Sequence, residues 1–319
     1  MHIDRFTAAV AAALIAAGWP WPVAAAATSN RVWVSGHGVD ASGCGAPTTP
    51  CRSLQYAHDH AVSAGGEIDI LDPAGYGAVT ITKAVSIVND GVGTAGVQAT
   101  SGNAITINAG VNDAVYLRGL NIGGVNFTGA YGVVATSGAK LTIVDCVVEH
   151  FSSGGVAIEP AADIRFLISD TLITSVHGAG LIIQSSGGAV TGTVDRVTAS
   201  DTGGGVTMGS DTAGGSVAVI LSHATFSEND GNGVTLSAGV GAHVVATLDD
   251  VEANLNYDGL LLNGQATAHV SRSVFNQNAD TGVFNNTTSS GVIYSMGDNV
   301  ARANGANSTF GLITTQSPF

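Results

Sequence analysis

Residues 141–159 read LTIVDCVVEHFSSGGVAIE, and residues 166–184 read FLISDTLITSVHGAGLIIQ, so one pattern returns after 25 positions. In both copies an apolar strand ends at an aspartate, a second apolar stretch follows, and a glycine opens a third. Short strands separated by turn residues at a near-constant period are typical of solenoids, whose stacked repeats share one core. The pattern therefore predicts a stack of coils, each built from short β-strands.

The same glycine marks seven repeats. It heads the segments GVVAT, GVAIE, GLIIQ, GVTMG, GVTLS, GLLLN and GVFNN, at Gly132, Gly155, Gly180, Gly205, Gly233, Gly259 and Gly282, with intervals of 23, 25, 25, 28, 26 and 23 residues. Turns of variable length explain the spread, and glycine suits such turns because it adopts positive φ without a Cβ clash. The hexapeptide period of a left-handed β-helix and the nonapeptide period of a calcium-binding roll are not sustained. We therefore predict an all-β chain folded as a single-stranded right-handed parallel β-helix of about ten coils.

Equivalent apolar positions predict the core of this solenoid. Stacked strands lie about 4.8 Å apart, so inward side chains of successive coils contact one another. The expected inward columns are Ile143, Ile168, Leu221 and Val270, and Val148, Ile173, Phe226 and Phe275.

The N-terminus has the features of a secretory signal. A short polar start with Arg5 is followed by an apolar run and by the small residues Val23 to Ala27, which offer a cleavage site. An uncleaved anchor is the alternative, but Pro20 and Pro22 interrupt the apolar run. We predict an exported protein, either secreted or located in the periplasm or cell envelope. No later segment reaches the length of a membrane span.

Export favours disulfides, and Cys44 and Cys51 flank a turn-rich spacer of six residues. We predict that they pair. Cys146 lies between apolar residues in IVDCVVEH and is interpreted as a small buried side chain.

The formal net charge of −14 narrows the range of partners. Only ten Lys and Arg residues are present, and they are dispersed along the chain. Nucleic acid needs clustered cations, and anionic membranes present the same difficulty, so neither is expected as a partner. A polysaccharide or a surface protein remains, and the oligomeric state is left open.

Three N-terminal segments resemble a known superfamily. They are PCRSLQYAHDHA (50–61), GGEIDILDPAGY (65–76) and VTITKAVSIVNDG (79–91), and they are similar to the cap and first coil of pectin lyase-like proteins. The resemblance extends over nearly the whole chain after the signal and is greatest to exported bacterial right-handed β-helix repeat proteins, a group that implies no activity. It implies a helix covering the open end of the solenoid. The resulting organisation is a signal peptide (1–27), a cap with a helix and first strand (28–77), β-helix repeats (78–303) and a C-terminal cap or tail (304–319).

A polar column ten residues before the repeat glycine carries the candidate catalytic residues. It comprises Asp145, Asp170, Asp195, His223, Asp249 and Arg272. Stacked carboxylates at Asp145, Asp170 and Asp195, with Arg196 or Arg165 nearby, could act as a general acid and base or hold a cation. The alternative is that aspartate recurs because its side chain bonds to turn backbone.

A second column, Asn229, Asn254, Asn278 and Asn304, predicts an asparagine ladder in which side-chain amides bond between coils. The histidines His150, His177, His223 and His243 lack metal-ligand spacing and are interpreted as solvated turn residues. No cofactor or metal is predicted; calcium is conceivable but no residue pattern supports it.

The catalytic motifs of the pectin lyase-like enzymes are largely missing. Gly36-His37-Gly38 and Asp249-Asp250 match two polygalacturonase motifs, but in reversed order and without the accompanying segments. The sequence therefore favours a non-catalytic surface or envelope protein that binds a glycan or another protein. The alternative is a polysaccharide lyase or glycoside hydrolase of an unrecognised family.

Overall fold

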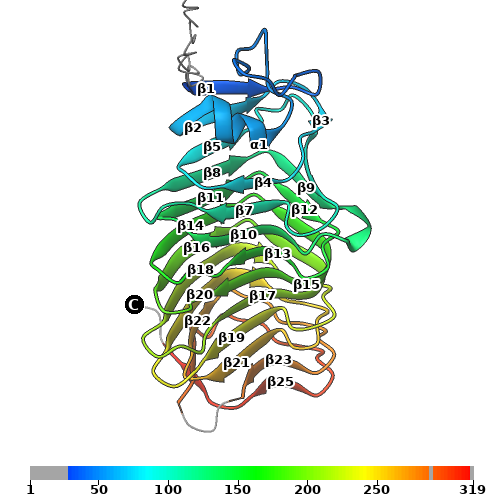
Figure 1. Cartoon of the computed structure of the whole chain (residues 1–319). Coiled ribbons are helices and arrows are strands. Elements are labelled where there is room, and N and C mark those ends of the chain that lie inside the picture. The colour runs from blue at the N-terminus through cyan, green and yellow to red at the C-terminus, as the bar shows by residue number, and fades with distance from the viewer. Residues whose placement is uncertain (1–27, 287–289, 317–319) are drawn as a thin grey trace, which may run out of the picture.

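The computed structural model describes residues 28–286 and 290–316, so the predicted signal peptide lies outside the described residues. Strands hold 56% of the residues and helices 4%, and the chain forms an all-β solenoid of about nine turns, close to the ten expected. The solenoid is a right-handed parallel β-helix, shown upright in Figure 1 with the N-terminal end at the top. Within the described residues, no helix has the length and apolar character needed to cross a membrane.

Each coil contributes to three faces, and strands of successive coils pair in parallel on each face. The first face consists of β1 (Ser29–Val34), β2 (Val62–Ile70), β5 (Val85–Val88), β8 (Ala114–Arg118), β11 (Lys140–Val144), β14 (Ile164–Ser169), β16 (Ala189–Asp195), β18 (Ser216–Thr225), β20 (His243–Glu252), β22 (Thr267–Ser271), β24 (Val292–Ser295) and β26 (Ile313–Thr315). The second face consists of β3 (Ala74–Gly75), β6 (Ala95–Ala99), β9 (Leu120–Gly124), β12 (Val147–Glu149), the first parts of β15 (Leu172–Gln184) and β17 (Thr198–Ser210), and the last two residues of β18 and of β20, which continue past the turn. The third face consists of β4 (Val79–Ile81), β7 (Ile105–Asn108), β10 (Tyr131–Ser137), β13 (Gly154–Ile158), the last parts of β15 and β17, β19 (Val234–Ala238), β21 (Leu260–Gly264), β23 (Thr281–Asn285) and β25 (Asn307–Phe310). We call the turn from first to second face the first corner, the next the second corner, and the return to the first face the third corner.

The core is a stack of side chains from equivalent strand positions. Register places Ile143, Ile168, Val194, Leu221, Leu248 and Val270 in one column, all of them buried. The predicted second set, with Val148, Ile173, Phe226 and Phe275, is buried as well. One coil cannot bury these side chains alone, so the stack as a whole supplies the hydrophobic stabilisation.

The repeat glycines have a different cause from the one predicted. None of the seven has positive φ; they begin the third-face strands and approach the next coil closely. A Cβ on Gly155 would lie 2.5 Å from the carbonyl oxygen of Gly180 and 2.5 Å from Cγ2 of Ile173. Glycine is therefore required because there is no room for a side chain, not because the backbone turns there.

A short helix closes the N-terminal end. The Ser53 hydroxyl accepts a hydrogen bond from Tyr56 N (3.2 Å) and caps α1 (Leu54–Tyr56), which continues as a π-helical turn, η1 (Ala57–Ala61). Leu54 is fully buried against the first coil. Gln55 Oε1 and His58 Nε2 accept hydrogen bonds from Thr80 N (2.7 Å) and Thr82 N (3.2 Å), at the edge strand β4 and just after it. The cap thus covers apolar surface and satisfies backbone donors at the same time.

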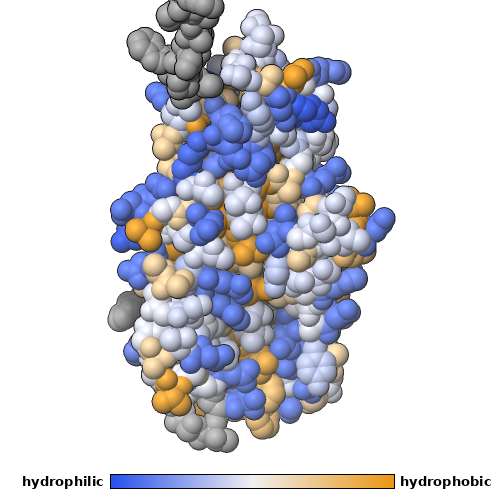
Figure 2. All heavy atoms as spheres, viewed as in Figure 1, coloured by the Kyte–Doolittle hydropathy of each residue, from blue (hydrophilic) through white to orange (hydrophobic). Residues whose placement is uncertain are grey.

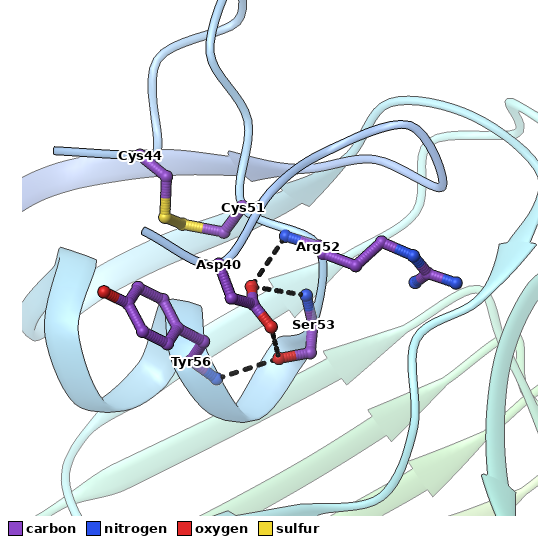
Figure 3. The surroundings of a disulfide bond; sticks show 6 residues. All are labelled: Asp40, Cys44, Cys51, Arg52, Ser53 and Tyr56. Atoms are coloured by element: carbon purple, nitrogen blue, oxygen red, sulfur yellow. Dashed lines mark hydrogen bonds between the residues drawn. A yellow bond between two sulfur atoms is a disulfide. The ribbon is translucent and has the colours of Figure 1, made fainter. Parts of the chain in front are cut away.

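The Cys44–Cys51 disulfide forms in the loop that leads into this helix, with the two Cα atoms 5.0 Å apart. Figure 3 shows Asp40 beside it, accepting hydrogen bonds from the backbone of Arg52 (2.8 Å) and Ser53 (3.0 Å). The remaining cysteine, Cys146, is buried, and burial raises the pKa of its thiol to about 11. It behaves as a core residue, as predicted.

Parallel pairing extends beyond both limits of the predicted repeat region, residues 78–303. β2 and β3 already pair with β5 and β6, so the solenoid begins before residue 78. Residues 304–316 were expected to cap the last coil, but β25 and β26 continue it by pairing with β23 and β24. The repeat cannot be recognised in the sequence of this segment because Ser308 occupies the position of the repeat glycine. The parallel pairing of the strands nevertheless continues.

Candidate functional site

The predicted aspartate column lies at the first corner, but two of its members are displaced. The residues that share the corner position are Asp145, Asp170, Arg196, His223, Asp250 and Arg272, all with φ between 48° and 57°. Asp195 and Asp249 lie one residue earlier, at strand positions paired with Ser222. The prediction that Asp145, Asp170 and Asp195 are stacked equivalents is therefore wrong at Asp195. From Asp170 onward the corner carries carboxylates and basic residues in mixed order, where the prediction had three successive carboxylates.

Four of these side chains form a charged cluster, which we call the corner cluster: Asp170, Asp195, Arg196 and His223. Arg196 Nε and Nη2 donate to the two carboxylate oxygens of Asp170 at 2.7 and 2.9 Å, and Nη1 contacts Asp195. Asp195 Oδ1 also lies 2.9 Å from His223 Nδ1. The bidentate geometry fixes the guanidinium plane between adjacent coils. Asp145 has no part in the cluster.

The electrostatics of the corner cluster keep both carboxylates ionised. The hydrogen bond from Arg196 lowers the pKa of Asp170 below its usual range. For Asp195, burial raises the pKa, but the contacts with His223, Ser222 and Arg196 outweigh burial and lower it. The Arg196 and His223 side chains are each 56% exposed, so the cluster faces solvent. Such carboxylates serve as acceptors and ion-pair partners, and neither is poised as a general acid.

The need to form a turn explains why aspartate recurs at the first corner. At the corner, the backbone N–H of Asp145 donates to Ser169 O (3.2 Å), and that of Asp170 donates to Asp195 O (3.1 Å), so each coil pairs with the next. Aspartate tolerates the left-handed conformation better than most residues. Histidine shares part of this tolerance, whereas Arg196 does not, and its ion pair with Asp170 helps to offset the backbone cost.

Arg165, the other predicted cation, lies elsewhere. It points outward from the first face on β14, five residues before the corner residue Asp170 and so roughly 16 Å from it along the strand. There it lines two adjoining hollows of about 400 and 500 Å³, which share Arg165 and Thr191. We call this continuous depression the groove. It crosses strands of successive coils from β11 to β20.

The groove combines hydroxyl groups, apolar side chains and two cations. Thr191, Thr193 and Thr247 line it with hydroxyls, and Ile220 and Val245 are 49% and 38% exposed there. Lys140 and Arg165 occupy paired positions on β11 and β14. Asp163 is the acidic residue of the lining, and its carboxylate accepts a hydrogen bond from Ala189 N (2.8 Å). The groove is thus locally basic in a chain of net charge −14.

Sequence reasoning missed the groove because it searched for acidic columns. A signal was present: outward positions alternate with buried ones along each first-face strand, and Ile220 and Val245 are apolar at outward positions. Exposed aliphatic side chains grouped on one face mark interaction surfaces.

A second missed cluster lies at the second corner. The ring of Phe127, in the insertion between β9 and β10, stacks on His177 with centroids 4.2 Å apart and meets His150 edge-on at 5.5 Å. His150 and His177 therefore pack against an aromatic ring, which corrects the expectation that they are simply solvated. A small hollow of about 180 Å³ is lined by Phe127 and His177 and also by Asp201 and Glu228.

The asparagine column is a ladder, with one rung misassigned. Asn229 Nδ2 donates to Asn256 Oδ1 (3.0 Å), and Asn256 N donates to Asn278 Oδ1 (2.9 Å). Asn278 Nδ2 continues the ladder to Asn304 Oδ1 (3.1 Å). Asn254, the predicted rung, lies two residues away and accepts a hydrogen bond from Asn276 N (2.8 Å). The ladder is therefore a structural feature of the second corner.

Within the described ranges, no group of three or more His, Cys, Asp or Glu side chains is arranged to hold a metal ion. The chain matches no protein-family model, no curated protein and no solved structure. The functional conclusion that follows is drawn from the geometry of the groove and of the corner cluster.

Proposed function

We propose that the protein is an exported β-helix of the pectin lyase-like superfamily that binds an extended glycan along the groove and does not transform it. The observation that carries this proposal is the pair of adjoining hollows on the first face, which share Arg165 and Thr191. Membership of the superfamily is supported by the parallel solenoid and the capping helix.

The lining of the groove suits a carbohydrate. Threonine hydroxyls both donate and accept hydrogen bonds, and the Arg165 guanidinium donates to hydroxyl or carboxylate oxygens. Ile220 and Val245 offer apolar contact to the C–H faces of sugar rings. A chain that lies along the solenoid axis meets a new strand about every 4.8 Å, so similar contacts recur along its length. Repetition of weak contacts gives affinity for a polymer and little for a monosaccharide.

Binding to a glycan array, followed by calorimetry on the best polysaccharide, tests this proposal. Arg165→Ala should weaken binding at least about tenfold, which corresponds to about 1.4 kcal/mol. Arg196→Ala is the matched control, because Arg196 lies in the following coil but belongs to the corner cluster. Likewise Ile220→Asn should weaken binding, whereas Leu172→Asn, an exposed aliphatic residue of the second face, should leave it unchanged. Equal losses in the Arg165 and Arg196 variants would argue against the groove.

A lyase or hydrolase centred on the corner cluster is the second candidate. It is favoured by the contact between Asp195 and His223, since a carboxylate can orient an imidazole as a general base. The same polysaccharides should be assayed for reducing ends and unsaturated products. Turnover that disappears in His223→Ala and persists in Arg165→Ala would replace the non-catalytic proposal with this one.

A further inference from the structure

The C-terminal end of the solenoid is open. Beyond β25 and β26 no further strand pairs with them in the described part of the chain. Phe310 and Leu312 of the last coil are 53% and 64% exposed, and the ring of Phe310 also packs edge-on against Phe284 of the preceding coil, with centroids 5.1 Å apart. A hollow of about 260 Å³ opens among core residues that include Phe275 and Ile293. Strand β25 lies at the lower end of the molecule in Figure 1, and Figure 2 shows apolar residues among those at the surface of this end.

The charge of this end differs from that of the rest of the molecule. Residues 296–316 contain two charged side chains, Asp298 and Arg302, and have no net charge, whereas the chain as a whole carries −14. Two copies of an acidic protein repel each other, and the repulsion is smallest where the facing surfaces are neutral. The edge strands also lack the lysines, prolines and inward charges that normally prevent edge pairing. This combination favours a second copy of the chain over an oppositely charged partner.

The order of the faces determines how two such ends can meet. Around each coil the chain runs from the first corner to the second corner and then to the third corner. A two-fold axis in the plane of the end, passing through the third corner, exchanges the first and second corners. Each edge strand then runs antiparallel to the strand that faces it, a geometry that allows hydrogen bonds between sheet edges. Asp298 follows β24 at the first corner, and Arg302 lies at the second corner, so this axis brings the two opposite charges together twice.

We propose that the C-terminal end is a homodimer interface, in which two copies stack end to end about this two-fold axis. The interface is isologous, and the helix and disulfide loop close the other end of each copy. Assembly therefore stops at two copies and does not continue into a filament.

Sedimentation velocity and light scattering on the whole chain test the proposal. The parent should show a concentration-dependent mass that reaches, and does not exceed, twice that of the chain. Leu312→Asp should give a monomer with an unchanged circular dichroism melting curve, because Leu312 is exposed. Phe310→Asp should also give a monomer, with a slightly lower melting temperature because the edge-on contact with Phe284 is lost. Val240→Asp is the control: Val240 is 84% exposed, lies between β19 and β20, and should leave the dimer intact. A monomeric parent, a growing filament, or a dimer that survives Phe310→Asp would overturn the proposal.

The choice of axis has its own test. Asp298→Arg should weaken dimerisation at least about tenfold by placing like charges together, and adding Arg302→Asp should restore it. If the exchange fails to restore the dimer, this two-fold axis is wrong.

Discussion

The two ends of the solenoid differ in how the core and the edge strands are covered. At the N-terminal end, Leu54 covers the core, and Gln55 and His58 accept hydrogen bonds from backbone N–H groups. At the C-terminal end, Phe310 and Leu312 remain exposed beside strand edges that no further strand of residues 28–286 and 290–316 pairs with. A parallel β-helix exposes its core and its strand edges at each end and must cover both to stay soluble. The first end is thus closed by the chain itself, and the contrast with the second end is the reason for the homodimer that we propose.

The largest expected difference between the ends is in packing. Leu54→Ala removes a fully buried side chain from the cap and should destabilise the fold by about 2–5 kcal/mol. Ile313→Ala, in the partly buried last strand, should cost much less because the site can relax. Urea unfolding followed by far-ultraviolet circular dichroism measures both. Equal losses would mean that the cap contributes no more than an ordinary terminal strand.

A smaller effect is expected from the ladder, which ends at Asn304 on the open side. Asn256→Leu leaves the carbonyl of Phe226 and the amide group of Asn229 without their side-chain partner, and it should cost about 1–3 kcal/mol. Asn254→Leu is the matched variant in the same coil, with fewer buried partners and a smaller expected loss. Thermal melts compare the two. If Asn254→Leu proved the more destabilising, the rung would have been assigned wrongly.

The smallest expected effect depends on pH and concerns the closed end. Burial raises the pKa of Asp72, but hydrogen bonds from Ser35 Oγ (2.6 Å), Gly36 N (2.7 Å) and Tyr76 Oη (2.8 Å) outweigh it and lower the pKa. A lowered folded-state pKa stabilises the fold above the unfolded value, about pH 4, and the contribution is lost as the pH falls below it. Acid should therefore loosen the N-terminal end first.

Trp33 reports on this loosening, because it is the only tryptophan after residue 27 and lies on β1. In protein that begins at residue 28, its fluorescence should change at a higher pH than the overall circular dichroism. In Asp72→Asn this separation should shrink. Coincident transitions in the parent would show that Asp72 does not control the acid stability of the cap.

The sequence predicts the stacking of this fold well and its corners less well. Ile143, Ile168, Leu221 and Val270 share one buried column, as expected, because hydrophobic burial enforces the period on every coil. The corners were counted back from the repeat glycine. The corner residue lies ten residues before the repeat glycine at Asp170 but nine before it at Arg196. The second corner in the coil of Arg196 is one residue shorter. The amino-acid composition of a turn does not reveal that the turn is one residue shorter than in the neighbouring coils.

The same limit explains the misplaced ladder and the missed groove. Asn256 lies in another coil with a shortened corner, so the fixed spacing selected Asn254 instead. The groove depends on which outward residues of five neighbouring strands adjoin, and that follows from register between coils. The sequence of one strand shows which of its side chains point outward, but it does not show how that strand is aligned with the strand of the next coil.

The parallel pairing that joins the coils also determines how the molecule would respond to tension. The backbone hydrogen bonds between coils point along the solenoid axis, so a force that pulls on the C-terminal end acts on one coil at a time, beginning with β26, the last strand of the described residues. Each detached coil of about 25 residues yields roughly 85 Å of extended chain, where it had occupied about 4.8 Å of the axis. The molecule would therefore lengthen in many small steps under load, as an extensible tether does.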